Sequence, residues 1–288
     1  MPSTVGTLAR RLRDLLLMAV ADGGCVRRSV VVTGGGRGIG RALVERLARD
    51  EATVVVAIER EAAALDWITA HPYADRLVSV VGDAANEQVA ECAAARAETA
   101  APLAGWVNNA AVFRDASLHA APAREVLDLI VVNLSLAVVG CATAVRHFLR
   151  AGSGGAIVNI SSHQAQRAVR GALPYATAKA AIEGLTRALA VDYGPRGIRV
   201  NAVALGSIET ERYRQFLGQQ EPATAAAIQR EMAHLHPLGR VGLATEVAAA
   251  VAFLVSEDAS FINGAIVPVD GGRAALGRDP QELAPESP

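Results

Sequence analysis

The scarcest residue type in this 288-residue chain is lysine, because 27 of its 28 basic residues are arginine and Lys179 is the one exception. Lys179 lies four residues after Tyr175, so a helix here would bring the phenol and the ammonium to one face. A planar guanidinium does not replace a compact ammonium in such a contact. The adjacent cation is expected to favour the phenolate and lower the tyrosine pKa, which makes the pair a candidate proton-transfer site.

Cysteine is also scarce, with only Cys25, Cys92 and Cys141, which are scattered and form no CxxC motif. This argues against a disulfide framework and against a zinc site, so no metal site is predicted. A reducing compartment, the cytoplasm, is the predicted location.

Aromatic residues make up 4% of the chain and hydrophobic residues 51%, mostly Ala, Val and Leu, which favours parallel strands covered by alanine-rich helices. The net charge of −1 gives no field that would attract nucleic acid or an anionic membrane. A small-molecule partner is therefore predicted.

Long apolar runs are few. Residues 130–145 are apolar but include Asn133, Ser135 and Thr143, and the run is shorter than the roughly 20 residues of a membrane-spanning helix, so it is interpreted as a buried or interface helix. Leucines at helical spacing predict an amphipathic helix over residues 7–21, rather than a signal peptide.

Strand-like runs alternate with longer stretches that can form helices, and no repeat or linker divides the chain. The predicted strands are Ser29–Thr33, Thr53–Ile58, Leu77–Val81, Gly105–Val107, Ala156–Ile160, Ile198–Val203 and Ala265–Val269. This order predicts an α/β fold in a single domain, a Rossmann-like doubly wound parallel sheet of about seven strands.

A glycine-rich loop joins the first predicted strand to the first helix, in the sequence Thr33-Gly-Gly-Gly-Arg-Gly-Ile-Gly40. Glycines there let backbone N–H groups and the positive end of a helix approach a pyrophosphate. The second strand ends at Glu59, where an acid commonly meets the adenine ribose. The cofactor candidates in this region are Gly34, Gly36, Arg37, Gly38, Ile39, Gly40 and Glu59.

Together these residues resemble the short-chain dehydrogenase/reductase family, TGxxxGIG and YxxxK type, over residues 28–273. The segments that carry the resemblance are Thr33–Gly40, Val81–Ala84, Asn108–Ala111, Asn133, Ile157–Ser162, Tyr175–Lys179 and Pro268–Gly272. The resemblance implies an extension at residues 1–27, a catalytic domain with a substrate lid around residues 207–237, and a tail at residues 274–288. It also implies an NAD(P)-dependent oxidoreductase of a secondary alcohol or ketone.

The resemblance implies four catalytic residues. Tyr175 would exchange a proton with the substrate oxygen, and Ser162 would hold that oxygen. Lys179 would lower the Tyr175 pKa and hydrogen-bond the nicotinamide ribose. Asn133 would position a water that links Lys179 to solvent.

The resemblance also implies further cofactor contacts, at Asp83, Ala84, Asn109, Ala110, Tyr175, Lys179, Gly206, Ile208 and Thr210. One departure is Leu205-Gly206 in place of the family's usual Pro-Gly, which removes some rigidity from that loop.

The choice between NAD and NADP depends on two conflicting residues. Glu59 would repel a 2′-phosphate, whereas Arg37 lies where a basic residue of NADP-preferring members often reaches that phosphate. The balance favours NAD, on the expectation that Glu59 neutralises Arg37.

The substrate itself is left open, between 3-oxoacyl thioesters and polyols or sugars as leading classes. The candidate substrate contacts are Ser162, His163, Gln164 and Tyr213, and Arg167 or Arg170 could receive an anionic group. Two alternatives remain: a non-redox lyase or epimerase, and a catalytically silent cofactor-binding regulator. A homotetramer or homodimer is also implied.

Overall fold

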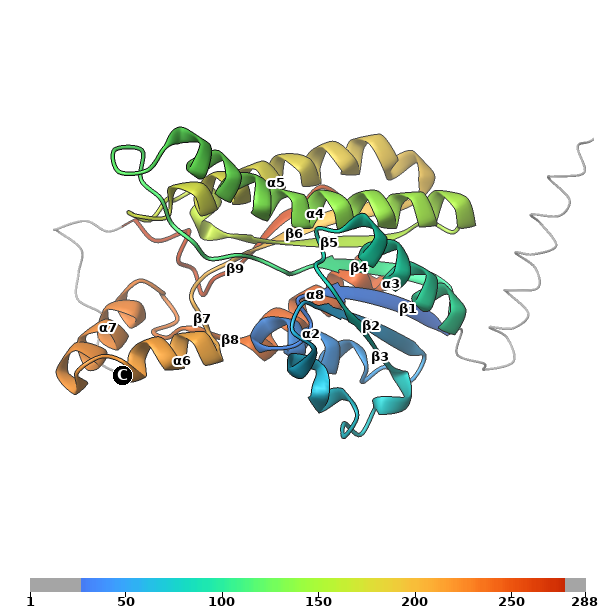
Figure 1. The fold of residues 1–288 in the computed structure, drawn as a ribbon, viewed down its shortest axis with the longest axis horizontal. Helices are drawn as coiled ribbons and strands as arrows, with labels where there is room; N and C mark the ends of the chain where they lie inside the picture. The colour runs from blue at the N-terminus through green and yellow to red at the C-terminus, as the bar shows by residue number, and fades with distance from the viewer. Residues whose placement is uncertain (1–26, 278–288) are drawn as a thin grey trace, which may run out of the picture.

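A computed structural model of the chain describes residues 27–277, and its centre is a parallel seven-stranded sheet with the order β3-β2-β1-β4-β5-β6-β9 (Figure 1). Every predicted strand overlaps a strand of this sheet, so the predicted fold class is confirmed. The strands are β1 (Arg28–Thr33), β2 (Thr53–Glu59), β3 (Leu77–Val81), β4 (Leu103–Asn108), β5 (Gly155–Ser162), β6 (Ile198–Leu205) and β9 (Ile266–Val269).

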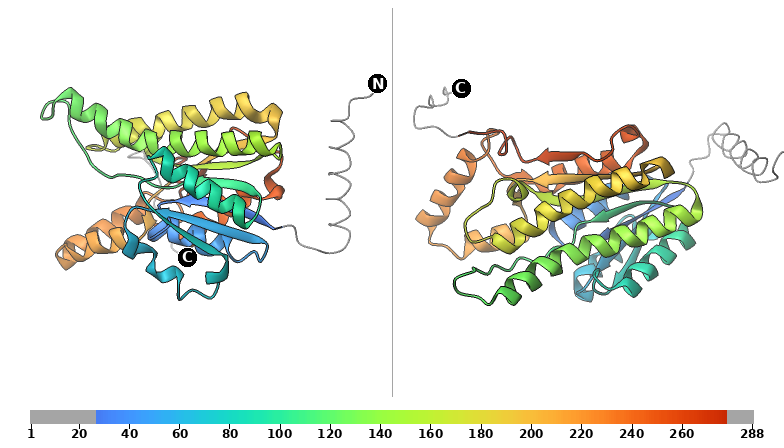
Figure 2. Two further views of the ribbon diagram at one scale, coloured as in Figure 1. Left: turned by 45° about the vertical axis from the view of Figure 1, so that its right-hand side comes forward. Right: turned by 90° about the horizontal axis from the view of Figure 1, so that it is seen from above.

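Helices cover both faces of the sheet (Figures 1 and 2). One face carries α2 (Gly38–Leu47) and α8 (Ala244–Val255), and the other carries α3 (Glu87–Ala100), α4 (Ala123–Ala151) and α5 (Leu173–Tyr193). Within residues 27–277 the connecting segments also contain five short 3-10 helices, at Ala62–Ile68, Ala74–Arg76, His163–Ala165, Gly194–Arg196 and Glu257–Ala259.

The period-two alternation of the strands builds the two halves of the core. In β1, Val30 and Val32 join the apolar cluster beneath α2 and α8, whereas Val31 joins the cluster beneath α3, α4 and α5. All three valines are completely buried. Both faces of the central strands are thus apolar, as expected for a parallel sheet covered on both sides.

Helix α4 contains the apolar run at residues 130–145 and is longer than the run itself, with 29 residues that end at Gly152 in the left-handed conformation (φ +66°). By length and composition α4 could cross a membrane, so the expectation that it is too short was wrong. The same test is passed by core helices of soluble proteins, and one side of α4 packs on the sheet while Leu127, Val131 and Val138 are exposed.

Helices α6 (Glu211–Gly218) and α7 (Pro222–His234) extend from the edge of the sheet where the strands end, and neither has a buried residue (Figure 1). A ladder of two-residue strands, β7 (Ile208–Glu209) and β8 (Gly242–Leu243), joins the ends of this segment. The helix predicted over residues 7–21 lies outside the described residues.

Candidate active site

The predicted catalytic residues come together at the edge where the parallel strands end. Ser162 is the last residue of β5, and α5 carries Tyr175 and Lys179. The glycine-rich loop leaves the end of β1 and Asn109 follows β4, so both segments reach this edge from neighbouring strands. This is the position at which open α/β sheets bind ligands.

Lys179 is buried, with 2% of its surface exposed, and its Nζ donates a hydrogen bond to the Ile160 carbonyl at 2.7 Å. Nζ also lies 5.4 Å from the centre of the Tyr175 ring. Burial lowers the pKa of Lys179 to about 8, because desolvation disfavours the ammonium. The one lysine of the chain is therefore held in a fixed position beside the tyrosine.

Tyr175 differs electrostatically from the expectation. Burial raises the pKa of its phenol to about 12, and this effect outweighs the hydrogen bond from Ser162 and the charge of Arg212, which both lower it. The predicted lowering of the Tyr175 pKa by Lys179 was thus wrong for this structure. The physical reason is that the ammonium bonds to the Ile160 carbonyl while the phenol is desolvated.

Ser162 and Asn133 are both buried. The Ser162 hydroxyl hydrogen-bonds Tyr175 and accepts from the Gln164 N–H at 3.2 Å. The Asn133 side chain accepts from the Val112 N–H and donates to the Val112 carbonyl, both at 2.9 Å. Asn133 therefore fixes the loop after β4, and its role in a proton relay stays a prediction.

The glycine-rich loop has the geometry of an anion cradle. Gly34 and Gly38 have positive φ values of +65° and +52°, which favour glycine. A Cβ on Gly36 would lie 2.9 Å from the Glu59 side chain. Arg37, at the N-cap of α2, makes no side-chain capping bond, so the first N–H groups of the helix are available to a pyrophosphate.

Thr33 is a site residue that the sequence reasoning missed. Its hydroxyl oxygen accepts from the Asn109 and Ala110 N–H groups, both at 3.0 Å. The Asn109 amide in turn donates to the Thr33 and Gly34 carbonyls at 3.0 and 3.1 Å. The two predicted cofactor segments are thus tied together, and the Asn109 side chain is engaged in that tie.

At the end of β2, the Glu59 carboxylate accepts from the Gly36 N–H at 3.3 Å and from the Arg60 N–H at 2.8 Å. Arg37 instead forms an exposed ion pair with Glu61, at 2.9 Å between Nη2 and Oε2. The expectation that Glu59 neutralises Arg37 was therefore wrong, because Glu59 turns toward the loop backbone and Glu61 meets the guanidinium.

The other predicted cofactor residues line the same edge. Asp83 is exposed after β3, with Oδ1 accepting from the Ala85 N–H at 2.9 Å. The Thr210 hydroxyl accepts from the Tyr213 N–H at 3.3 Å and so caps α6. The remaining ones lie on the adjoining segments: Ile39 and Gly40 on α2, Ala84 after β3, Gly206 after β6 and Ile208 in β7.

The predicted substrate contacts have different surroundings. His163 is 7% exposed, and burial, followed by the charge of Arg273, lowers its pKa to about 4. The Gln164 Oε1 atom is buried without a partner among residues 27–277. Tyr213 is half-buried on α6, and burial raises its pKa.

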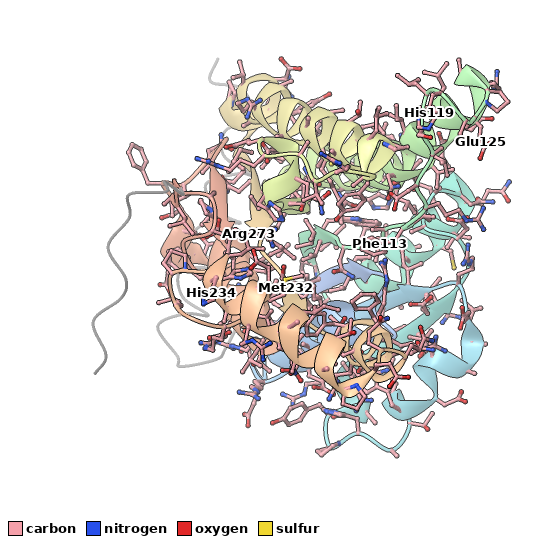
Figure 3. All side chains as sticks on the ribbon, turned by 90° about the vertical axis from the view of Figure 1, so that its left-hand side faces the viewer. Phe113, His119, Glu125, Met232, His234 and Arg273 are labelled. Carbon is pink, nitrogen blue, oxygen red and sulfur yellow. The ribbon has the colours of Figure 1, made fainter. Side chains whose placement is uncertain are left out.

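Two further side chains near Tyr175 were not predicted. The Phe113 ring stacks on the Tyr175 ring with 5.1 Å between centres, and the Arg212 guanidinium lies 3.9 Å from the centre of the Phe113 ring. Figure 3 shows Phe113 between the α6–α7 helices and the rest of the protein. The sequence did contain a signal for Phe113, because an aromatic residue in a loop is unusual in a chain with only 4% aromatic residues.

Two of the cavities formed by residues 27–277 differ in how close they lie to the catalytic residues. The larger, of about 660 Å³, lies between the Arg114 loop and the start of α4, away from the catalytic residues, and charges of both signs line it. The smaller, of about 200 Å³, has His163 in its wall. Because His163 directly follows Ser162, the smaller cavity is the better candidate for a part of the active site.

Known proteins share this sequence and fold. Residues 34–274 match the family model described as enoyl-(acyl carrier protein) reductase. Levodione reductase of Leifsonia aquatica is 34% identical, with 86% of this chain and 94% of the relative covered. Galactitol 2-dehydrogenase (L-tagatose-forming) of Cereibacter sphaeroides is 36% identical, with 87% and 95% covered.

Solved structures agree with these relatives. A structure of levodione reductase superimposes with a TM-score of 0.79 at 31% identity, covering 88% of this chain and 99% of that one. Ligand-free aldohexose dehydrogenase of Thermoplasma acidophilum gives 0.76 at 32% identity, covering 91% and 98%. The chain therefore belongs to the short-chain dehydrogenase/reductase family and is an NAD(P)-dependent oxidoreductase of small-molecule alcohols and ketones.

Proposed function

We propose that Tyr175 is the general acid and base of the reaction. In the direction of ketone reduction its phenol donates a proton to the substrate oxygen, and Ser162 donates a hydrogen bond to the same oxygen. The observation that carries this proposal is the hydrogen bond between Ser162 and Tyr175 beside a buried ammonium. A pKa of about 12 keeps the phenol protonated and ready to donate.

Lys179 has two tasks in this mechanism. Its buried ammonium lies 5.4 Å from the centre of the Tyr175 ring and helps to hold that ring in position. Its remaining N–H donors are available to the nicotinamide ribose, since one already binds the Ile160 carbonyl. Asn133 holds the neighbouring loop in position and orders the water that returns a proton to Lys179.

The loop from Gly34 to Gly40 holds the cofactor's pyrophosphate, and the segments after β3, β4 and β6 hold its adenine and nicotinamide ends. The uncapped start of α2 and the positive φ values of Gly34 and Gly38 support this assignment. The bound nicotinamide supplies hydride for reduction or takes it up in oxidation.

NAD is the preferred cofactor in this proposal. A carboxylate at Glu59 disfavours the 2′-phosphate of NADP. Arg37, the cation that could reverse this preference, already pairs with Glu61 at 2.9 Å.

Replacing Tyr175 with Phe tests the chemistry. The loss of the phenol oxygen should lower turnover by about 10²–10⁴-fold while cofactor binding is retained. Tyr193→Phe, at the end of the same helix, is the matched control. Unchanged turnover in Tyr175→Phe would contradict the mechanism, and substrate loss with flat nicotinamide absorbance would indicate a non-redox reaction.

The substrate is a secondary alcohol or ketone, with polyols or sugars and 3-oxoacyl thioesters as the leading classes. Similarity to galactitol 2-dehydrogenase and aldohexose dehydrogenase supports the first class. Residues 207–237 act as the lid over this substrate, in keeping with the lack of buried residues in α6 and α7. A panel of alcohols and ketones with each cofactor tests class and cofactor together.

The enzyme assembles as a homodimer or homotetramer in the cytoplasm. Support for assembly comes from the exposed apolar face of α4, where Leu127, Val131 and Val138 are 56%, 54% and 41% exposed. The unpaired thiols of Cys92 and Cys141 are compatible with a reducing compartment. Light scattering that detects only monomer would contradict the assembly.

A further inference from the structure

The cavity of about 200 Å³ that has His163 in its wall is lined by positively charged and neutral side chains. Its walls are formed by the basic or polar His163, Arg167 and Arg273 and by the apolar Ala168, Val169, Leu235 and Leu276. No acidic residue of the described part of the chain lines it. A small cavity with two guanidinium groups and apolar walls is chemically suited to an anion that carries a carbon chain.

Arg273 keeps most of its hydrogen-bonding capacity free. Its Nη1 donates to the Ser207 hydroxyl at 2.7 Å, and no carboxylate of residues 27–277 lies within 4.0 Å of it. The nearby Asp270 carboxylate accepts instead from the Gly272 and Ala274 N–H groups, at 2.9 and 2.8 Å. A guanidinium carries five N–H donors, so donors remain for a ligand.

His163 contributes a second unengaged polar group. Its side chain is almost completely buried, and neither ring nitrogen has a hydrogen-bond partner in the part of the chain that the structure describes. With a pKa lowered to about 4, the ring is neutral at pH 7 and offers one N–H donor. The ring can therefore donate one hydrogen bond to an anion that enters the cavity.

The position of the cavity ties it to the reacting oxygen. His163 directly follows Ser162, and Ser207, the partner of Arg273, directly follows Gly206. Leu235, just after α7, closes the cavity from the lid side, and Figure 3 shows Arg273 and Met232 beside each other at the base of that helix. His163 therefore brings the cavity next to the residue that holds the substrate oxygen in the proposed mechanism.

We propose that Arg167 and Arg273 bind a carboxylate of the substrate, which makes the substrate a hydroxy acid and its product the corresponding keto acid. This inference rests on the oxidoreductase function proposed above. In oxidation the hydroxyl carbon loses a hydride to the cofactor and the hydroxyl proton passes to the phenolate form of Tyr175, while the carboxylate is unchanged. A carboxylate matches the planar fork of a guanidinium in a bidentate pair.

The test compares free 3-oxoacids of four to eight carbons with their methyl esters, which keep the ketone and lose the charge. Wild-type enzyme should show a kcat/KM at least about tenfold higher for the best acid than for its ester, because the ester cannot form the charge-assisted hydrogen bonds with the two guanidinium groups. Arg273→Met and Arg167→Met should each lower this acid-to-ester ratio about tenfold. Arg196→Met, an exposed arginine outside the cavity lining, is the matched control and should retain the ratio.

Two further measurements distinguish a wrong carboxylate site from a misfolded variant and from a wrong oxidoreductase function. Arg273→Lys keeps the charge and should recover part of the ratio, which distinguishes recognition from misfolding. Ligand-detected NMR of the matching 3-hydroxyacids with wild-type protein reports binding without turnover. Equal rates for acids and esters, or no saturable binding of any acid, would overturn the carboxylate site. Acid binding that Arg273→Met abolishes, without hydride transfer, would support the site and count against the proposed oxidoreductase function alone.

Discussion

The edge of the sheet at β1, β4 and β5 and the α6–α7 segment form the two sides of the site, and they are built in opposite ways. At the edge, Lys179 and Asn133 are 2% and 4% exposed, and each of these two side chains donates a hydrogen bond to a backbone carbonyl. In α6 and α7 no residue is buried, and contacts to the rest of the protein are few, such as Arg212 on Phe113.

This difference in burial matches a division of tasks, in which the sheet edge carries the catalytic groups and the α6–α7 segment covers the substrate. A proton donor has to be held in place to within a fraction of an ångström, so its neighbours are buried and hydrogen-bonded. A covering segment has to open and close, so its contacts have to be weak enough to exchange. Substitutions at the edge should therefore have large effects, and substitutions in α6 and α7 small ones.

The largest effect is expected for Lys179→Arg. The longer, planar guanidinium does not fit the buried position next to the Ile160 carbonyl, so activity should fall about 10³-fold although the charge is kept. Arg187→Lys, an exposed position on the same helix, is the control and should leave activity unchanged. Steady-state rates and denaturation curves of both variants check this. A fully active Lys179→Arg would mean that the lone lysine is an accident of composition.

Thr33→Val should weaken the edge without touching a predicted catalytic residue. Valine has the shape of threonine but accepts no hydrogen bond, so the Asn109 and Ala110 N–H groups lose their partner. We expect the free energy of unfolding to fall by about 2–4 kcal/mol, with weaker cofactor binding. Thr99→Val, at an exposed position of α3, is the control and should change the free energy of unfolding by no more than about 0.5 kcal/mol. Equal stability losses in the two variants would show that the tie is unimportant.

A large share of this edge was predictable from the sequence because its signals are local. A glycine loop between strand and helix and the spacing of Tyr175 and Lys179 each depend on backbone geometry over a few residues. The seven strands were predicted for a similar reason, since their apolar runs reflect burial on both faces.

The parts that were missed depend on contacts between distant segments. Thr33 meets Asn109 across 76 positions of the chain, and Arg212 meets Phe113 from a helix whose docking no periodicity reveals. The choice of Glu61 over Glu59 as partner of Arg37 depends on side-chain direction. The Tyr175 pKa was misjudged because sequence spacing indicates the neighbouring charge but not the desolvation.

Lys179→Met should show that the ammonium costs stability. Its folded pKa of about 8 is lower than the ordinary 10.5, so the unfolded chain binds this proton more tightly than the folded protein. The penalty is full below about pH 8 and disappears as the pH rises toward 10.5, and stability rises over that interval by up to about 3 kcal/mol. Lys179→Met should lack this rise and be inactive. Parallel curves of unfolding free energy against pH for both proteins would contradict this.

Cofactor choice should change by a smaller amount, about tenfold. Glu59→Gln removes the charge that repels a 2′-phosphate and should raise the ratio of kcat/KM for NADP over NAD about tenfold. Glu61→Gln frees Arg37 from an exposed ion pair of less than about 1 kcal/mol and should raise the ratio only a few-fold. A larger effect at Glu61 than at Glu59 would identify Arg37 as the dominant residue.

The smallest effect is expected for Arg212→Gln, which tests whether the α6–α7 segment acts on the chemistry at all. The Arg212 charge lowers the pKa of Tyr175, and its loss should move the rising limb of alcohol oxidation to higher pH. A cation–π contact at a surface contributes about 0.5–1 kcal/mol, so the rate at pH 8 should fall only about two- to fivefold.

Arg214→Gln, on the same helix beside Glu209 and Glu211, is the control. If both variants move the pH profile equally, the effect belongs to the charge of the helix and not to the stack on Tyr175. If only Arg212→Gln moves it, closure of this segment delivers a cation to the proton donor, and the two sides of the site are coupled through Phe113.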